Sequence, residues 1–168
     1  FNGWVGELPP DDAADEALGW VKAGFKSMKI KVGSDLRQDI ERVLAIRDVV
    51  GASVRLRMDA NEQYSVKQAL ELDEAVKNCD LELFEQPVIR SDLEGLAEVR
   101  RRCKTPIMAD ESISDHSSLL RVIRADCADY VKFGVAQAGG VLAAGKMIST
   151  AAAAGLKVVM GHGFGLNP

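Results

Sequence analysis

The sequence predicts an α/β fold in which parallel strands form a (β/α)8 barrel of the TIM type. Six short apolar segments have the character of strands, and their first residues are separated by 27, 27, 26, 23 and 27 residues. Helical patterns fill the intervals, so each connection is a crossover between parallel strands. The even repeat favours a barrel over an open doubly wound sheet, and so does the absence of a G-x-G-x-x-G motif after the first strands.

Each predicted strand is short and bounded by polar or turn-forming residues. The six strands are expected at residues 27–31, 54–59, 81–85, 107–110, 130–133 and 157–160. The segment FNGWVG at residues 1–6 is expected to add one more. Seven strands can therefore be counted, and the eighth strand of a closed barrel is missing.

The predicted helices begin and end at suitable residue types. A first helix is expected at about residues 11–23, and others at 36–50 and 140–154. Three more begin after N-cap residue types, namely Ser65, Asp92 and Asp115. Two helices end before glycines, Gly51 and Gly155, which favour helix termination.

Composition indicates a soluble protein without a nucleic-acid or membrane partner. The net charge of −4 provides no basic footprint for nucleic acid and no polybasic patch for a membrane surface. No apolar run approaches the roughly 20 residues needed to span a bilayer. The three widely spaced cysteines are odd in number, which is typical of a reduced cytoplasmic protein.

Ionisable side chains occur at the carboxyl ends of six successive predicted strands. They are Lys31, Asp59, Glu85, Asp110 with Glu111, Lys132 and His162. Any one of them alone would be interpreted as a solvated loop charge. In parallel barrels, however, these strand ends surround the active site, whereas structural interiors are filled by Val, Ile and Leu. The repeated position therefore favours an active site.

Three of these residues are carboxylates that end consecutive strands. Asp59, Glu85 and Asp110 are separated by 26 and then 25 residues. Neighbouring parallel strands lie about 4.8 Å apart, so the carboxylates would repel one another without a cation between them. Oxygen ligands favour a hard metal, most naturally Mg²⁺. The alternative is a salt-bridge network with the lysines, which explains the charges but not their register.

The segment SMKIKVG at residues 27–33 alternates apolar residues with two lysines. Met28, Ile30 and Val32 fall on one face of the expected strand, and Lys29 and Lys31 on the other. A lysine face in water would indicate an ordinary edge strand. A lysine face inside the protein would indicate a chemical role.

Five segments in this order, KIKVG, RMDANEQYS, LFEQPV, MADES and AGGV, closely resemble the enolase superfamily in its mandelate racemase and muconate lactonising branch. The resemblance covers nearly the whole chain. It implies a (β/α)7β-type barrel and a Mg²⁺ ion held by Asp59, Glu85 and Asp110. It also implies removal of the proton α to a carboxylate, which gives a metal-stabilised enediolate.

The resemblance assigns roles to the two lysines and to the residues around the metal. Both lysines are expected to face the barrel interior, with Lys31 as the base. Lys29 and Mg²⁺ would favour the neutral form of Lys31. Glu111 is an alternative metal ligand to the favoured Asp110, because the racemase-like branch has a glutamate there. Asn61 and Gln86 are expected to support the ligands by hydrogen bonds.

The sixth strand departs from the family pattern. Alignment of AGGV at residues 138–141 places Gly134 where a catalytic lysine or aspartate usually stands. Lys132 has the same facing about 6.6 Å lower, and we expect it to reach up past Gly134 as the second acid/base. One alternative gives that role to His162 alone, and another makes Lys132 the buried partner of a carboxylate. The segment GHGFG at residues 161–165 could instead bind phosphate.

We therefore expect a Mg²⁺-dependent racemase, epimerase, cycloisomerase or dehydratase that acts on a small-molecule carboxylate. Residues 1–168 are expected to form one partial barrel domain, without the N-terminal capping domain of the family and without the last strand. Two unpaired sheet edges would favour a homo-oligomer. A non-catalytic barrel or assembly module is the alternative. An unrelated Mg²⁺ barrel such as an aldolase is disfavoured by the motif order.

Overall fold

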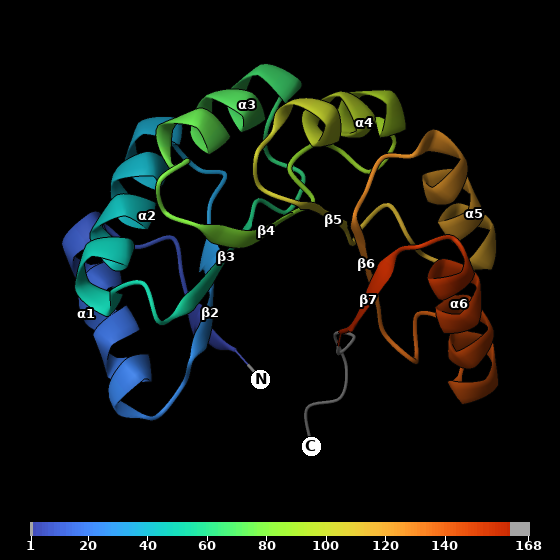
Figure 1. Ribbon diagram of the computed structural model, residues 1–168, viewed down its shortest axis with the longest axis horizontal. Coiled ribbons are helices and arrows are strands. Elements are labelled where there is room, and N and C mark those ends of the chain that lie inside the picture. Colours follow the sequence, from blue (N-terminus) through green and yellow to red (C-terminus); the bar gives the residue numbers. More distant parts are fainter. Residues whose placement is uncertain (1, 162–168) are drawn as a thin grey trace.

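A computed structural model describes residues 2–161 and shows one sheet of seven parallel strands in sequential order. The sheet curls into an arc, with the helices on its convex side and the strands lining its concave side (Figure 1). The strands are β1 (Gly3–Val5), β2 (Ser27–Lys31), β3 (Arg55–Asp59), β4 (Leu81–Glu85), β5 (Ile107–Ala109), β6 (Tyr130–Phe133) and β7 (Lys157–Met160). Within the described residues, β1 and β7 are the two edges of the sheet, so closure into an eight-stranded barrel is not seen.

Six helices alternate with the strands, as the sequence predicts. They are α1 (Pro10–Lys22), α2 (Leu36–Val50), α3 (Val66–Ala75), α4 (Leu93–Arg102), α5 (His116–Ala125) and α6 (Val141–Ala153). The predicted N-caps of α3, α4 and α5 are confirmed, because the side chains of Ser65, Asp92 and Asp115 each accept a hydrogen bond from a backbone N–H of the first helical turn. None of these helices is long and apolar enough to cross a membrane.

The core lies between the sheet and the surrounding helices. Met28, Ile30 and Val32 on β2 are buried in it. Lys29 and Lys31 extend from the opposite face of β2, where they contact carboxylates of β3 and β4. The predicted orientation of the lysine face, toward the interior, is confirmed. Alternation along β2 thus separates packing residues from residues available for chemistry.

A buried polar cluster fixes the end of β2. Arg42 on α2 donates from Nη1 to the carbonyl oxygen of Lys31 at 3.1 Å and also pairs with Asp39. The second carboxylate oxygen of Asp39 accepts hydrogen bonds from the backbone N–H of Gly33 at 2.8 Å and from the hydroxyl of Tyr64 at 2.5 Å. Burial and the neighbouring Asp39 raise the pKa of Tyr64, which keeps its hydroxyl protonated as a donor. The position of Lys31 is therefore fixed from outside the sheet as well as within it.

Candidate active site at the carboxyl ends of the strands

The register of the sheet brings the predicted site residues side by side. Lys31 on β2 is the aligned partner of Asp59 on β3, and Asp59 is the aligned partner of Glu85 on β4. Glu85 is aligned with Met108, so Asp110 follows two residues later, just after β5. Consecutive parallel strands thus deliver these side chains to one end of the sheet, where active sites of parallel barrels lie.

Asp59 forms ion pairs with both lysines of β2. Its Oδ2 atom lies 2.7 Å from the Nζ atom of Lys29 and 2.7 Å from that of Lys31. Lys29 also approaches Glu85 Oε2 at 3.5 Å. Asp59 is fully buried and Glu85 is 1% exposed, so their charges depend on these ammonium groups for compensation.

Lys132 on β6 joins the cluster from the other side. Its ammonium group lies 2.6 Å from Glu85 Oε1 and 2.6 Å from Asp110 Oδ2. A Cβ atom added to Gly161 would lie 2.8 Å from Lys132 Cε, so glycine there leaves room for the lysine side chain. The structure thus shows Lys132 as a partner of carboxylates, which is one of the expected alternatives, whereas its role as second acid/base stays a prediction. His162 and most of the GHGFG segment lie outside the described residues.

Burial and neighbouring charges shift the pKa values of Asp59, Glu85 and Lys132 in different directions. Burial acts to raise the pKa of Asp59, but the ammonium groups of Lys29 and Lys31 lower it below its usual value. Burial and the negative charge of Asp59 together raise the pKa of Glu85. Burial opposes the charged form of Lys132, but Glu85 and Asp110 outweigh it and raise the lysine pKa. Ionised Asp59 and protonated Lys132 are therefore both favoured.

Two polar side chains, Gln86 and Asn61, form hydrogen bonds around the carboxylates proposed to bind the metal. The amide oxygen of Gln86 accepts hydrogen bonds from the backbone N–H groups of Asp110 at 3.0 Å and Ser112 at 3.1 Å. Asn61 accepts a hydrogen bond from Lys31 and donates one to Glu111 at 2.8 Å. Gln86 supports Asp110 as expected, whereas the Asn61 side chain contacts Lys31 and Glu111 and none of the three favoured ligands. The Asn61–Glu111 contact was not foreseen, because the sequence suggested Glu111 only as an alternative metal ligand.

The donor set suits Mg²⁺ in its chemistry. Asp59, Glu85 and Asp110 offer only oxygen atoms, and the proximity of Asp59 already raises the pKa of Glu85. Within residues 2–161, no three His, Cys, Asp or Glu side chains are arranged to hold a metal ion. Ammonium groups instead lie between the carboxylates, bridging Asp59 with Glu85 and Glu85 with Asp110. A cation of either kind can balance the buried negative charge.

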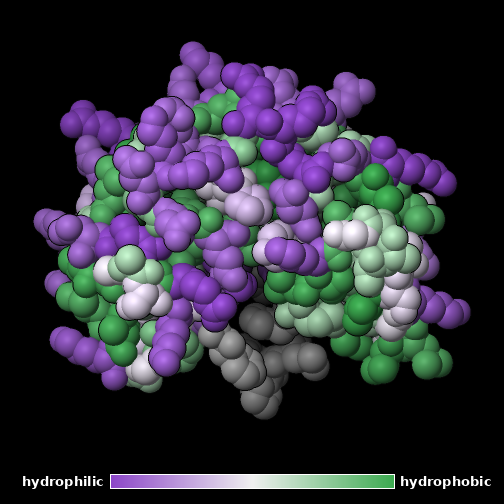
Figure 2. Space-filling view, in the orientation of Figure 1, coloured by the Kyte–Doolittle hydropathy of each residue, from purple (hydrophilic) through white to green (hydrophobic). Residues whose placement is uncertain are grey.

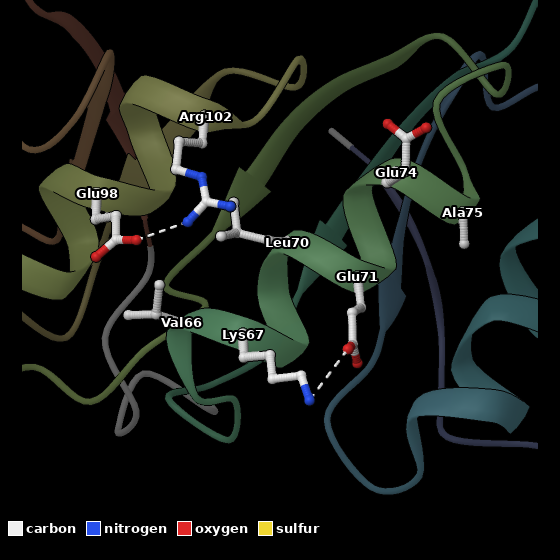
Figure 3. Close-up of a pocket in the computed structure, with 8 residues that line it drawn as sticks. All are labelled: Val66, Lys67, Leu70, Glu71, Glu74, Ala75, Glu98 and Arg102. Atoms are coloured by element: carbon white, nitrogen blue, oxygen red, sulfur yellow. Dashed lines mark hydrogen bonds and ion pairs between the residues drawn. The ribbon is translucent and has the colours of Figure 1, made fainter.

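A separate groove of about 670 Å³ lies on the outside of the sheet, between α3 and α4 (Figure 3). Four of its five charged residues are paired with one another, Lys67 with Glu71 at 3.7 Å and Arg102 with Glu98 at 2.7 Å, and the fifth, Glu74, pairs with Lys77. None of the residues that line it belongs to the cluster at the strand ends. The groove therefore adds nothing to the chemistry of the candidate site.

Comparison with known proteins identifies a matching family and relatives that are epimerases. Residues 12–167 match the family described as enolase C-terminal domain-like. The hydrophobic dipeptide epimerase of Enterococcus faecalis is 39% identical over 152 residues, which cover 90% of this chain and 43% of that protein. The L-Ala-D/L-Glu epimerase of Bacillus subtilis is 38% identical over 155 residues, which cover 90% of this chain and 42% of that protein.

Solved structures share the fold. The crystal structure of the Enterococcus faecalis dipeptide epimerase complexed with Mg and the dipeptide L-Leu-L-Tyr superposes with a TM-score of 0.94 at 37% identity. The alignment covers 96% of this chain and 46% of that one. The N-succinyl Arg/Lys racemase of Bacillus cereus superposes with a TM-score of 0.93 at 27% identity, covering 96% of this chain and 44% of that one. The chain spans less than half the length of these relatives.

Proposed function

Because the chain belongs to the enolase C-terminal domain-like family, we propose that its cluster of lysines and carboxylates exchanges the proton α to a substrate carboxylate. The reaction we favour is epimerisation or racemisation of a dipeptide or an N-acylated amino acid. The observation that carries this proposal is the position of Lys31 beside the buried Asp59, at the end of the sheet where Glu85 and Asp110 also lie. Inversion at a carbon needs an acid/base group on each face, so Lys31 would serve one face and a second group the other.

Asp59, Glu85 and Asp110 would hold Mg²⁺. When bound, the ion would supply positive charge to stabilise the negative charge that develops on the substrate after loss of its α-proton. Lys31 would take or return the proton on one face, and Lys29 would support it from one layer below. The buried side chains Asp59 and Glu85 would keep these groups in fixed positions in a region of restricted water access.

The second acid/base group is either Lys132 or His162. The ion pairs of Lys132 with Glu85 and Asp110 favour His162 for the role. Lys132→Met should then leave α-proton exchange unchanged on both faces, whereas His162→Asn should abolish it on one. The opposite pattern would assign the role to Lys132.

The function can be tested with the full-length protein, Mg²⁺ and D₂O. The substrates are L-Leu-L-Tyr, L-Ala-L-Glu and N-succinyl-L-lysine, and NMR follows the α-proton signal and the appearance of the epimer. We expect deuterium to enter the α-position of at least one substrate. Lys31→Ala should abolish exchange on one face while leaving Mg²⁺ affinity largely intact. A folded, Mg²⁺-binding protein that exchanges none of them would contradict the proposal, and retained exchange on both faces in Lys31→Ala would remove Lys31 from the mechanism.

We also propose a cytoplasmic location and a single catalytic domain over residues 1–168. Three free cysteines support the location, since Cys79, Cys103 and Cys127 form no disulfide in the described residues. The continuous sheet order from β1 to β7 supports the single domain.

A further inference from the structure

Glu111 follows a proposed metal ligand directly, yet its side chain contacts an amide. Glu111 Oε1 accepts a hydrogen bond from Asn61 Nδ2 at 2.8 Å. On its other side, Asn61 Oδ1 accepts a hydrogen bond from the ammonium group of Lys31. Asn61 therefore lies between the candidate base and Glu111, and it connects the ends of β2, β3 and β5.

The chemistry of the three groups allows only one orientation of the Asn61 amide. An ammonium group only donates hydrogen bonds, an ionised carboxylate only accepts them, and an amide does both at opposite ends. With Nδ2 directed to Glu111, Oδ1 must face Lys31. The reversed amide would place a donor against the ammonium group and an acceptor against the carboxylate, so both hydrogen bonds would be lost.

The backbone of Asn61 is held independently of this contact. Its φ angle of 41° lies in the left-handed region, which asparagine tolerates well. Its backbone N–H donates to Asp59 Oδ1 at 3.2 Å, and its carbonyl oxygen accepts from Gln63 at 3.2 Å. Among the described residues, Glu111 is the only hydrogen-bond acceptor for Asn61 Nδ2. Two contacts therefore select the amide orientation, the hydrogen bond to Glu111 and the hydrogen bond from Lys31, and Glu111 is the partner that takes no part in proton transfer.

We propose that Glu111 is a positioning residue for proton transfer: by fixing the amide of Asn61, it holds the Lys31 ammonium group between Asn61 Oδ1 and Asp59 Oδ2. The inference rests on the proposed function, in which Lys31 exchanges the α-proton. Glu111 does not touch the substrate or the metal in this scheme. Its effect reaches the reaction only through Asn61 and Lys31.

Glu111→Gln is the decisive variant, because it keeps the size of the side chain but adds a donor. The side chain at position 111 then no longer discriminates between the two orientations of the Asn61 amide, and only the hydrogen bond from Lys31 still favours the original one. Exchange from L-Leu-L-Tyr and from D-Leu-L-Tyr reports the two faces separately, and Lys31→Ala identifies the face that Lys31 serves. We expect exchange on that face to fall about tenfold and exchange on the other face to keep its rate. An equal change on both faces, or no change, would overturn the proposal.

A double-mutant cycle tests whether Glu111 acts through Asn61. In an Asn61→Ala background the amide is absent, so Glu111→Gln should have no further effect on the Lys31 face. Additive losses in the double variant would show that Glu111 acts by another route, and the proposal would fail. Glu98→Gln, the same chemical change on the outside of α4, is the matched control and should alter none of these rates.

Calorimetric Mg²⁺ titration separates positioning from ligation. Asp110→Asn should weaken Mg²⁺ binding strongly, because it removes a proposed ligand, whereas Glu111→Gln should bind Mg²⁺ with the affinity of the unchanged protein. A loss in Glu111→Gln as large as that in Asp110→Asn would make Glu111 a metal ligand and end the positioning role.

A measurement that does not depend on enzymatic activity tests the positioning role of Glu111 separately from the proposed function. If the unchanged protein exchanges none of the three test substrates, the proposed function fails, and NMR of protein with ¹⁵N-labelled lysine Nζ still decides the positioning. The Lys31 ammonium signal is identified by its absence in Lys31→Ala. Its hydrogens should exchange with water several-fold faster in Glu111→Gln than in the unchanged metal-free protein. Equal rates would overturn the inference.

Discussion

At the scale of single residues, Asp59 and Glu85 are neighbours whose charges have opposite effects on stability. The lysines hold the pKa of Asp59 below its usual value. Its contribution to stability is therefore present above the unfolded-state pKa of about 3.9 and is lost as the pH falls through the lower folded-state pKa. Burial and Asp59 raise the pKa of Glu85. Its ionisation therefore costs stability as the pH rises from about 4.3 through the folded-state pKa.

Substitution of each carboxylate should reveal this difference. At pH 7 without Mg²⁺, Asp59→Asn should lower the free energy of unfolding by about 3 kcal/mol, because it leaves two partly buried ammonium groups without the carboxylate they share. Glu85→Gln should leave that free energy unchanged or raise it, since it removes an unfavourable buried charge. Urea unfolding in EDTA measures both. At pH 3.5 any gain from Glu85→Gln should disappear, and equal losses for the two variants at pH 7 would refute the account.

At the scale of secondary-structure elements, the loop after β2 depends on a glycine. Gly33 has a φ angle of 125°, and a Cβ atom there would lie 2.7 Å from Gln63 Cβ and 3.0 Å from the carbonyl oxygen of Ala60. Its backbone N–H also donates to the buried Asp39. Gly33 thus has a left-handed backbone conformation and also packs closely against the loop after β3, and both favour glycine at this position.

Gly33→Ala should therefore destabilise the protein more than the same change in a glycine with room around it. Gly24 is the matched control, with a φ angle of 92° and nothing within 4 Å of an added Cβ atom. We expect Gly24→Ala to cost about 1 kcal/mol and Gly33→Ala about 3 kcal/mol in the free energy of unfolding, as measured by urea denaturation. Similar costs for the two variants would show that packing at Gly33 is unimportant.

The elements and the strand-end residues could be predicted from the sequence because their signals are local. Alternation along residues 27–32 gave the facing of Lys29 and Lys31, and polar caps such as Ser65 marked helix starts that the structure confirms. The comparisons confirm the family resemblance. The contacts among charged side chains could not be predicted from the sequence, because lysines from several strands can reach the same carboxylates. The sequence offered a carboxylate partner for Lys132 only as one of several alternatives, and the hydrogen bond from Asn61 to Glu111 leaves no pattern in neighbouring sequence positions.

At the scale of the whole molecule, the described sheet has two unpaired edges and an apolar outer surface near one of them. Apolar side chains gather over α6, on the right of Figure 2. Val141 is 75% exposed, Leu142 is 86% exposed and Ile148 is 37% exposed. Open parallel edges and exposed apolar surface both favour association between chains.

A protein of residues 1–168 alone is therefore expected to dimerise or aggregate in dilute solution, as measured by light scattering. Leu142→Lys should reduce the association, because it places a charge within the apolar surface of α6. Lys67→Arg on α3, which preserves charge, is the control and should leave association unchanged. A stable monomer with a cooperative thermal transition would contradict the expectation.

The sequential order of the sheet also has a consequence for how the site forms during folding. Each strand pairs with the strand that precedes it in the chain, so contacts between neighbours close short loops and structure can grow from the amino-terminal end. Asp59, Glu85 and Asp110 would then be gathered before β6 is in place. Lys132 arrives last and brings the positive charge that Glu85 and Asp110 share. On a ribosome, the first five strands would carry an excess of buried negative charge until β6 emerges, and Mg²⁺ in the surrounding solution could balance it during that interval.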